Sequence, residues 1–189
     1  MHVIFLGYRV KIPWDPGPAW APVESICGMG DDLCEPPEDW TERWDFNRAS
    51  CYPTPQTAWA TVEAHPLRDQ FRLFAYEALP LALHDGQEPR EASLDELFDP
   101  LLPPLPLGPV PPPGMTILGY DVAEAQSAFI GYPWSPLMTN GFAGPEFPPN
   151  RLGLLDELPV ALGLAARVNA EMPEHAPHWV FRVWGEDPV

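Results

Sequence analysis

Proline is the feature that most constrains what this chain can fold into. The 189 residues include 28 prolines, spread from Pro13 to Pro188. Because proline has no backbone N–H and fixes φ, helix interiors and central strands have to fit between these positions. Hydrophobic residues still make up 46% of the chain. We therefore expect a folded protein built from short elements, not a disordered one.

The densest proline run divides the chain into two parts. Residues 100–114 contain eight prolines in fifteen positions, a composition that favours polyproline II and a semi-rigid connector. We predict a single domain over residues 1–189, with 1–99 and 115–189 as two possible sub-units of structure. A non-catalytic adaptor that uses the PxxP spacings as a ligand is an alternative, although the run has no flanking basic residues.

Short strands and helices are expected on both sides of this connector. In the first part we predict a strand over 3–12, a helix over 54–65 with Thr54 as N-cap, a strand over 71–83 for which a helix is the alternative, and a brief helix at the Ser93–Glu96 capping box. In the second part we predict a strand over 115–122, an irregular loop over 131–152, a helix opening at residues 156–159 and a strand over 178–184.

The helix after residue 156 has the clearest periodicity in the chain. Its apolar residues recur at helical spacing and are expected to face the core: Leu158, Ala161, Leu162, Ala165, Val168 and Met172. The predicted fold class is α+β, with a mostly antiparallel sheet, a few short helices, one longer amphipathic C-terminal helix and many Pro-rich loops. Strand, helix and strand recur in both parts, but no convincing internal sequence repeat is visible.

The charge of the chain restricts its partners. It has 27 acidic and 10 basic residues and a formal net charge of −17. Nucleic acids and anionic membranes would repel it, so we expect neither as a partner, and a basic protein fits better. The sequence shows no signal peptide and no apolar run long enough to span a bilayer, which predicts a soluble, cytoplasmic protein.

Motifs that carry catalytic chemistry are missing from the sequence. It has no G-x-S-x-G, no phosphate-binding loop and no H-E-x-x-H. Asp121, Ser135 and His178 are the residue types of a hydrolytic triad, and a small hydrolase with a site near Asp121, Ser135 and Asn140 is the alternative function. The residues of this loop are also ordinary turn formers, so a structural role is the simpler interpretation.

Neither a metal site nor a cofactor is expected. Glu171, Glu174, His175 and His178 have the spacing of a helical metal face, but prolines interrupt that helix and we expect solvent-exposed histidines. The cysteines Cys27, Cys34 and Cys51 match no zinc or redox spacing and are predicted to be free thiols.

Acidic and aromatic residues concentrate in one segment, residues 31–45. Acidic side chains can steer a cationic partner, and tryptophans can anchor it. A solvated surface that keeps the chain soluble is the alternative. The proline-rich stretch of residues 13–53 contains four tryptophans, Trp14, Trp20, Trp40 and Trp44. Burial of their rings on the core is expected, and a contact surface is the alternative. The candidate partner-binding residues are Asp31, Asp32, Glu35, Glu38, Asp39, Trp40, Glu42, Trp44 and Asp45.

The C-terminal part resembles a known group of bacterial proteins. The residues that carry the likeness are Gly119-Tyr120-Asp121-Val122, Ser135-Pro136-Leu137 with Asn140-Gly141, Asn150-Arg151 leading into Leu154-Leu155, and Val183-Trp184. In order and spacing they resemble immunity proteins of polymorphic toxin systems, over about residues 117–184. The resemblance implies a cytoplasmic, non-enzymatic protein that blocks a cognate toxin, for which a nuclease with a basic groove would suit the charge of this chain.

Overall fold

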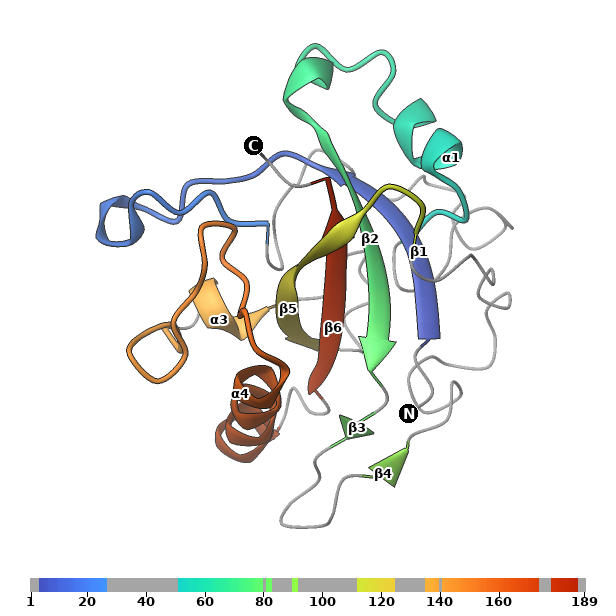
Figure 1. The fold of residues 1–189 in the computed structure, drawn as a ribbon. Helices are drawn as coiled ribbons and strands as arrows, with labels where there is room; N and C mark the ends of the chain where they lie inside the picture. Colours follow the sequence, from blue (N-terminus) through green and yellow to red (C-terminus); the bar gives the residue numbers. More distant parts are fainter. Residues whose placement is uncertain are drawn as a thin grey trace.

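The computed structural model describes the chain in eight stretches: residues 4–26, 51–79, 81–82, 90–91, 112–124, 135–139, 141–173 and 178–186. Four strands form an antiparallel sheet in the order β1-β2-β6-β5 (Figure 1). Their bounds are β1 Ile4–Lys11, β2 Arg72–Leu79, β5 Thr116–Glu124 and β6 His178–Gly185. The predicted α+β class and its antiparallel sheet are confirmed.

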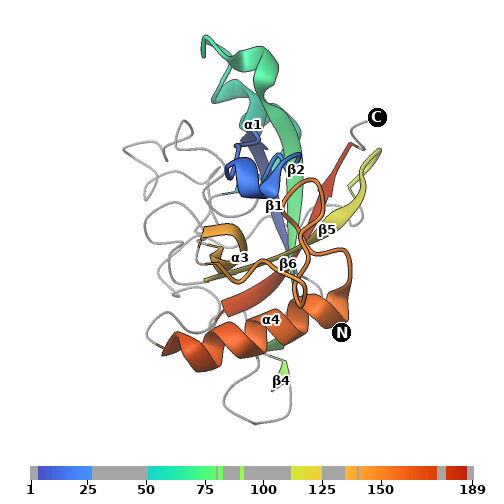
Figure 2. The same cartoon turned by 90° about the vertical axis from the view of Figure 1, so that its left-hand side faces the viewer.

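Helices lie beside this sheet. They are α1 Pro55–Ala60, α3 Pro136–Thr139 and α4 Leu158–Glu171, with 3₁₀ turns η1 Pro18–Trp20 and η2 Arg68–Gln70. Viewed from the side of β5, α3 and α4 lie in front of the sheet (Figure 2). A small second sheet pairs β3 Leu81–Ala82 with β4 Arg90–Glu91. In the ranges described, the helices are too short or too polar to cross a membrane.

The structure refines several sequence predictions. The strand over 71–83 is present as β2 and β3, so the helix alternative was wrong. The helix over 54–65 begins as predicted after Thr54 but ends at Ala60, and turns follow. The loop over 131–152 was predicted to be irregular, yet it contains α3 because burial of Leu137 outweighs the local turn composition. The Ser93–Glu96 capping box lies outside the described residues.

The two outer strand pairs of the sheet, β1–β2 and β5–β6, have equivalent registers. In the β1–β2 pair, Gly7 is opposite Tyr76, and in the β5–β6 pair Gly119 is opposite Val183. The remaining β1–β2 pairs have equivalents in the same way: Ile4↔Ala78 with Thr116↔Gly185, Phe5↔Glu77 with Ile117↔Trp184, Tyr8↔Ala75 with Tyr120↔Arg182, Arg9↔Phe74 with Asp121↔Phe181, Val10↔Leu73 with Val122↔Val180, and Lys11↔Arg72 with Ala123↔Trp179. Each edge strand also has its register shift at the leucine before the glycine. The sheet is therefore a structural repeat about a twofold axis between β2 and β6.

The segments that flank the sheet repeat as well. Tyr8 forms a backbone bridge with Tyr52, and Tyr120 forms the equivalent bridge with Leu155. A helix begins three residues after each bridge, at Pro55 in α1 and at Leu158 in α4, and the two helices lie beside opposite edge strands (Figure 1). We call the described part of residues 4–79 the first repeat and that of residues 116–185 the second repeat.

Each bridge requires a glycine on the edge strand. Gly7 has φ of 126° and Gly119 has φ of 146°, values that favour glycine. A Cβ on Gly119 would lie 2.8 Å from the Leu155 carbonyl oxygen, and one on Gly7 would meet the Tyr52 carbonyl. The two glycines belong to matching Leu-Gly-Tyr-x-Val sequences, residues 6–10 and 118–122. Sequence analysis missed this repeat because the shared residues are few and lie far apart along the chain.

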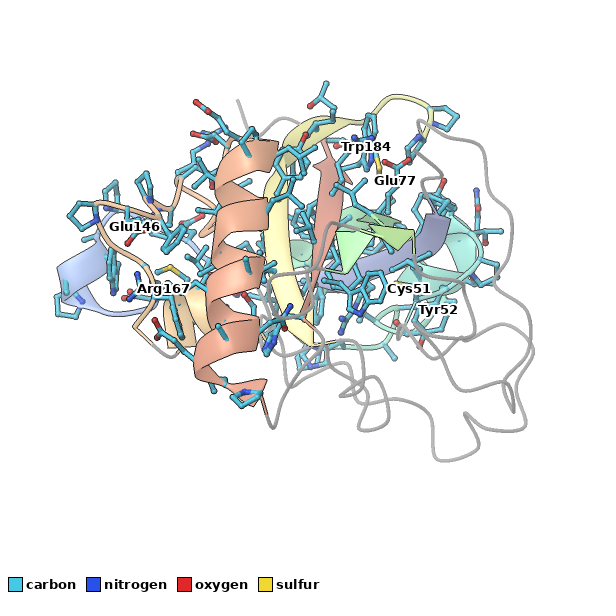
Figure 3. The ribbon with its side chains drawn as sticks, turned by 90° about the horizontal axis from the view of Figure 1, so that it is seen from below. Cys51, Tyr52, Glu77, Glu146, Arg167 and Trp184 are labelled. Atoms are coloured by element: carbon cyan, nitrogen blue, oxygen red, sulfur yellow. The ribbon has the colours of Figure 1, made fainter. Side chains whose placement is uncertain are left out.

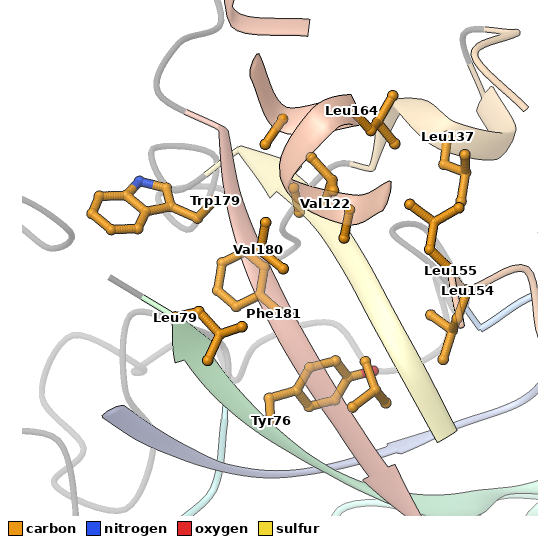
Figure 4. Close-up of a cluster of buried hydrophobic side chains, with 14 of the residues drawn as sticks. Tyr76, Leu79, Val122, Leu137, Leu154, Leu155, Leu164, Trp179, Val180 and Phe181 are labelled. Carbon is orange, nitrogen blue, oxygen red and sulfur yellow. The ribbon is translucent and has the colours of Figure 1, made fainter. Parts of the chain in front are cut away.

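The core consists of two clusters. The larger one gathers around β5, β6, α4 and the loops beside them, and the smaller one lies between α1, β1 and β2. Seen from below, α4 lies beside β5 (Figure 3), and Figure 4 shows Leu164 with Val122 and Val180 in the larger cluster. Trp14 and Trp20 pack against this cluster, partly buried, as expected. The stripe predicted for α4 faces the core, with Ala161, Ala165 and Val168 buried and Leu158, Leu162 and Met172 packed against it partly buried. Leu164, which the prediction left out, is fully buried.

Candidate functional site

The segment predicted to contact a partner, residues 31–45, lies outside the described residues. This covers all nine of its candidate residues: Asp31, Asp32, Glu35, Glu38, Asp39, Trp40, Glu42, Trp44 and Asp45. Asn140 of the alternative hydrolase site and residues 100–111 of the proline run also lie outside them. These assignments stay predictions, and candidate sites have to be found among the other residues.

Asp121 and Ser135 are brought together by the fold. The Ser135 hydroxyl donates a hydrogen bond of 2.6 Å to Asp121 Oδ1, and both side chains are buried. Asp121 lies on β5, and Ser135 immediately precedes α3. Hydrogen bonds to a carboxylate are among the stronger ones in proteins. This bond fastens the start of α3 to the edge strand.

His178 is buried, which corrects the prediction of a solvent-exposed histidine. Its backbone N–H donates to Asn169 Oδ1 of α4 over 2.6 Å, and its ring Nδ1 lies 3.0 Å from the same oxygen. In the sheet, His178 is opposite Glu124, three residues from Asp121 along β5. Because side chains alternate along a strand, His178 and Asp121 point to opposite faces. The fold therefore does not align Asp121, Ser135 and His178 as a triad.

Asn150 fixes the loop that leads into α4. Its Nδ2 donates to the Leu118 carbonyl (2.9 Å) and to Asp156 Oδ1 (2.8 Å). Its Oδ1 accepts from the backbone N–H groups of Leu152 (2.9 Å) and Leu154 (3.1 Å). All of the hydrogen-bonding groups of this amide are thus used to hold the loop against β5. Of the residues that carry the resemblance to immunity proteins, Gly119 and Asp121 lie on β5, and Ser135, Asn150 and Leu155 are joined to this strand by hydrogen bonds.

Two basic side chains of β1 are buried near a thiol. The Lys11 ammonium donates to the Ile26 carbonyl and to the Tyr76 hydroxyl, the latter over 3.2 Å, and Arg9 is also buried. Burial raises the pKa of the Cys51 thiol to about 12, although the charges of Arg9 and Lys11 oppose that shift. Within the described ranges, His, Cys, Asp and Glu do not come together in groups of three or more that could hold a metal ion.

An ion pair crosses the two central strands. Arg182 Nη1 donates to Glu77 Oε2 over 3.0 Å, and Glu77 is fully buried. The guanidinium also lies 6.0 Å from the ring centres of Tyr120 and Trp184 (Figure 3 labels Glu77 and Trp184). In the repeat, Glu77 corresponds to Trp184 and Arg182 corresponds to Ala75. The ion pair therefore has no counterpart across the axis.

A pocket of about 330 Å³ opens at the end of the sheet where β2 begins and β6 ends. Trp59 of α1 forms one wall, and we call this cavity the Trp59 pocket. Aromatic and aliphatic side chains line most of it, and two charged residues complete it: Phe71, Phe74, Leu73, Leu118, Leu152, Arg72 and Glu186. A concave, mainly apolar site with a few charged groups is typical of a binding pocket.

Trp59 also lines a second, shallower hollow on the exposed side of α1, together with Gln56 and Glu63. There the guanidinium carbon of Arg68 lies 5.5 Å from the Trp59 ring centre. This distance is within the range of a cation–π interaction. The indole thus forms a wall of two concave surfaces, and on one of them it already receives a guanidinium group.

The arginines near Trp59 are paired with exposed carboxylates. Arg68 Nη1 lies 3.8 Å from Asp69 Oδ1, and Arg72 Nη2 lies 3.5 Å from Glu24 Oε2. Such exposed pairs add little stability, but they compensate the positive charge of both arginines.

Two further carboxylates border the same hollows. Glu63 lines the shallow hollow and Glu186 the Trp59 pocket, and within the described part of the chain neither forms an ion pair. The surface around Trp59 therefore has a net negative charge. Sequence analysis did not single out Trp59. The available signal was a tryptophan in a helix of six residues, too short to cover a large ring.

Comparison of the chain with models of protein families, with curated proteins and with solved structures gave no match. The resemblance to immunity proteins therefore stays a prediction. Any function assigned to this chain has to be argued from its own charges and geometry.

Proposed function

We propose that this chain is a cytoplasmic protein that binds and neutralises a basic protein, as an immunity protein does with its cognate bacterial toxin. The observation that carries this proposal is the charge of the exposed surface. Nine acidic residues are exposed in the described ranges: Asp15, Glu24, Glu63, Asp69, Glu146, Asp156, Glu157, Glu171 and Glu186. Four basic residues are exposed there: Arg68, Arg72, Arg151 and Arg167.

The arrangement of the basic residues increases this imbalance. Arg9 and Lys11 are buried. Arg167 is bonded to Glu171 at 2.7 Å and to Glu146 at 2.8 Å, and the hydrogen bond with Glu171 raises the pKa of Arg167 (Figure 3). Basic side chains that are buried or paired cannot form the cationic patch that a nucleic acid would need. The outward field favours a cationic partner.

The acidic segment of residues 31–45 is the proposed first contact with that partner. It has seven acidic residues and one arginine, with Trp40 and Trp44 between them. Acidic residues mainly accelerate association, and tryptophans at an interface mainly slow dissociation. We therefore assign steering to the acids and anchoring to the two tryptophans.

Co-expression with the product of the adjacent gene tests this function. If the neighbour is a cognate toxin, its expression alone stops growth, and expression together with this chain restores growth. The two purified proteins should then form a complex whose association slows as salt is added. A neighbour that is harmless, or equally toxic in the presence of this chain, contradicts the proposal for that pair.

Association kinetics test the acidic segment separately. Replacing four of its acids by Asn or Gln should slow association about tenfold and flatten its salt dependence, because steering depends on local charge. The four are Asp31, Asp32, Glu35 and Asp39. A control variant removes equal charge elsewhere, at Glu88, Glu91, Asp95 and Glu96. If the association rate constant falls equally in the two variants, association depends only on the net charge, and residues 31–45 are not the first contact with the partner.

A further inference from the structure

We propose that the Trp59 pocket receives an arginine side chain of the basic partner, with its guanidinium against the Trp59 ring and Glu186 as its counter-charge. The inference rests on the proposed function, because it names an anchor point for the same partner. It adds a contact that is separate in sequence from residues 31–45.

The walls of the pocket suit a flat cation with an apolar stem. Trp59, Phe71 and Phe74 provide aromatic surface, and the volume of about 330 Å³ exceeds that of one side chain. A guanidinium stacks on aromatic rings and is more weakly hydrated than an ammonium, so its transfer into such a pocket costs less. The position of Arg68, 5.5 Å from the Trp59 ring centre, shows the same pairing within the chain.

The opening is particular to this end of the sheet. Gly185 lies beneath the pocket without a side chain, and a Cβ there would lie 2.6 Å from Leu118 Cδ1 and 3.2 Å from Phe74 Cδ1. Across the twofold axis, Leu6, Ala78 and Phe181 occupy the positions of Leu118, Gly185 and Phe74. The two ends differ at the first of these positions, because Leu6 is buried, whereas Leu118 is half-buried and lines the pocket.

The charges at the pocket select for a cation. Glu186 is exposed and forms no ion pair with a described residue, whereas Arg72 is compensated by Glu24 at 3.5 Å. A guanidinium in the pocket would form an ion pair with the Glu186 carboxylate. A carboxylate or phosphate in the same place would be repelled by Glu186 and would lose its hydration against mainly apolar walls. The occupant is thus positively charged.

Titration with a small arginine derivative tests the pocket without the partner. The probe is N-acetyl-L-arginine N-methylamide, and the readout is the indole N–H resonance of Trp59, assigned with a Trp59→Phe variant. We expect a saturable shift of this resonance in the millimolar range. The citrulline analogue has the same shape but no charge and should give less than a third of the shift. Equal shifts with both compounds, or no shift with either, overturn the inference.

Variants at the pocket distinguish a specific site from general attraction by a negative protein. Glu186→Gln should weaken binding of the probe about two- to fivefold, as expected for loss of an exposed ion pair. Trp59→Leu should weaken it by at least as much, through loss of the ring. Glu157→Gln, which removes an exposed charge beside α4, is the matched control and should change nothing. If Glu157→Gln and Glu186→Gln have the same effect, the site is not the pocket.

Failure of the inference is distinguishable from failure of the proposed function. If the wild-type chain binds and neutralises a basic partner, and Glu186→Gln and Trp59→Leu do so with unchanged affinity, the function stands and the pocket is not the anchor. If the wild-type chain binds no basic partner, the proposed function fails, whatever the arginine titration shows. Circular dichroism of each variant establishes that it is folded before either measurement.

Discussion

In the first repeat the six-residue α1 lies against β1 and β2, whereas in the second repeat the 14-residue α4 packs along β5 and β6. Both repeats have the same strand register, the same bulge before glycine and the same tyrosine bridge. They differ in the length of the helix that packs on the strands and in the contacts that hold the flanking segments. Side-chain hydrogen bonds of Asp121, Asn150 and Asn169 hold the described segments of the second repeat together, while α1 is held mainly by apolar contacts.

The features that the two repeats share are required by the fold, whereas the features in which they differ can serve function. The shared features are backbone geometry, which a bridge between a strand and the following helix requires in either repeat. In the second repeat, the longer helix and the side-chain hydrogen bonds cover the sheet and fix the loops beside it. The shorter helix leaves concave surface around Trp59. Four predictions test how far the two repeats differ, beginning with the residues at the axis.

The largest effect is expected at the central ion pair. Glu77→Ala leaves the guanidinium of Arg182 without its carboxylate between two central strands, which should lower the free energy of unfolding by about 3–5 kcal/mol. The double variant Glu77→Leu, Arg182→Met should recover most of this loss, because two apolar side chains need no partner. Urea denaturation measures both. A loss below about 1 kcal/mol in the single variant would contradict a structural role for this pair.

The next effect is expected at Asn150, whose sequence counterpart in the first repeat, Asn47, lies outside the described residues. Asn150→Ala removes four hydrogen bonds and leaves backbone groups at the β5 edge without partners, so stability should fall by about 3 kcal/mol. Amide exchange should accelerate at Leu152 and Leu154 but not at the Tyr8–Tyr52 bridge. Gln56→Ala, an exposed amide of α1, should change stability by less than about 0.5 kcal/mol. Faster exchange at both bridges would show that the two edges open together.

Cys51 of the first repeat corresponds to Leu154 of the second, and its thiol introduces a pH dependence there. Burial raises its pKa to about 12. Between about pH 9 and 12 the unfolded thiol loses its proton while the folded thiol keeps it, so stability falls as pH rises, by up to about 1.4 kcal/mol per unit. The stability of Cys51→Ala should decrease less steeply in this window. Parallel slopes for the two proteins would exclude the shift.

The sequence was sufficient to predict elements whose signals are local. Prolines and β-favouring residues delimit β1 and β6 closely, and the residues 156–159 mark the start of α4. The strand order could not be predicted, because it depends on pairing between β2 and β6, about a hundred residues apart in sequence. The burial of His178 depends on Asn169 of another element, and no local pattern contains that contact.

The candidate site was harder to predict than the fold for the same reason. The Trp59 pocket combines Trp59, the start of β2, Leu118, Leu152 and Glu186. Only the register of the sheet brings these segments to one end of the molecule. By contrast, the Asp121–Ser135 bond joins two residues that were named together from sequence, as residue types of a hydrolytic triad, and they lie only 14 positions apart along the chain. The net charge follows from the sequence without knowledge of which residues are in contact. The proposed function rests on this charge.

The smallest effect is expected at the helix starts, where the two repeats can be compared position by position. Thr54 caps α1 through its hydroxyl, which accepts from the Thr57 N–H over 3.1 Å, whereas Glu157 at the start of α4 makes no side-chain cap. Thr54→Ala should therefore cost about 1 kcal/mol and Thr54→Ser almost nothing, while Glu157→Ala should stay within about 0.5 kcal/mol. Thermal denaturation measures all three. Because α1 positions Trp59, only Thr54→Ala should also weaken binding of the arginine derivative, and an equal loss in Glu157→Ala would contradict a specific role of α1 in forming the pocket.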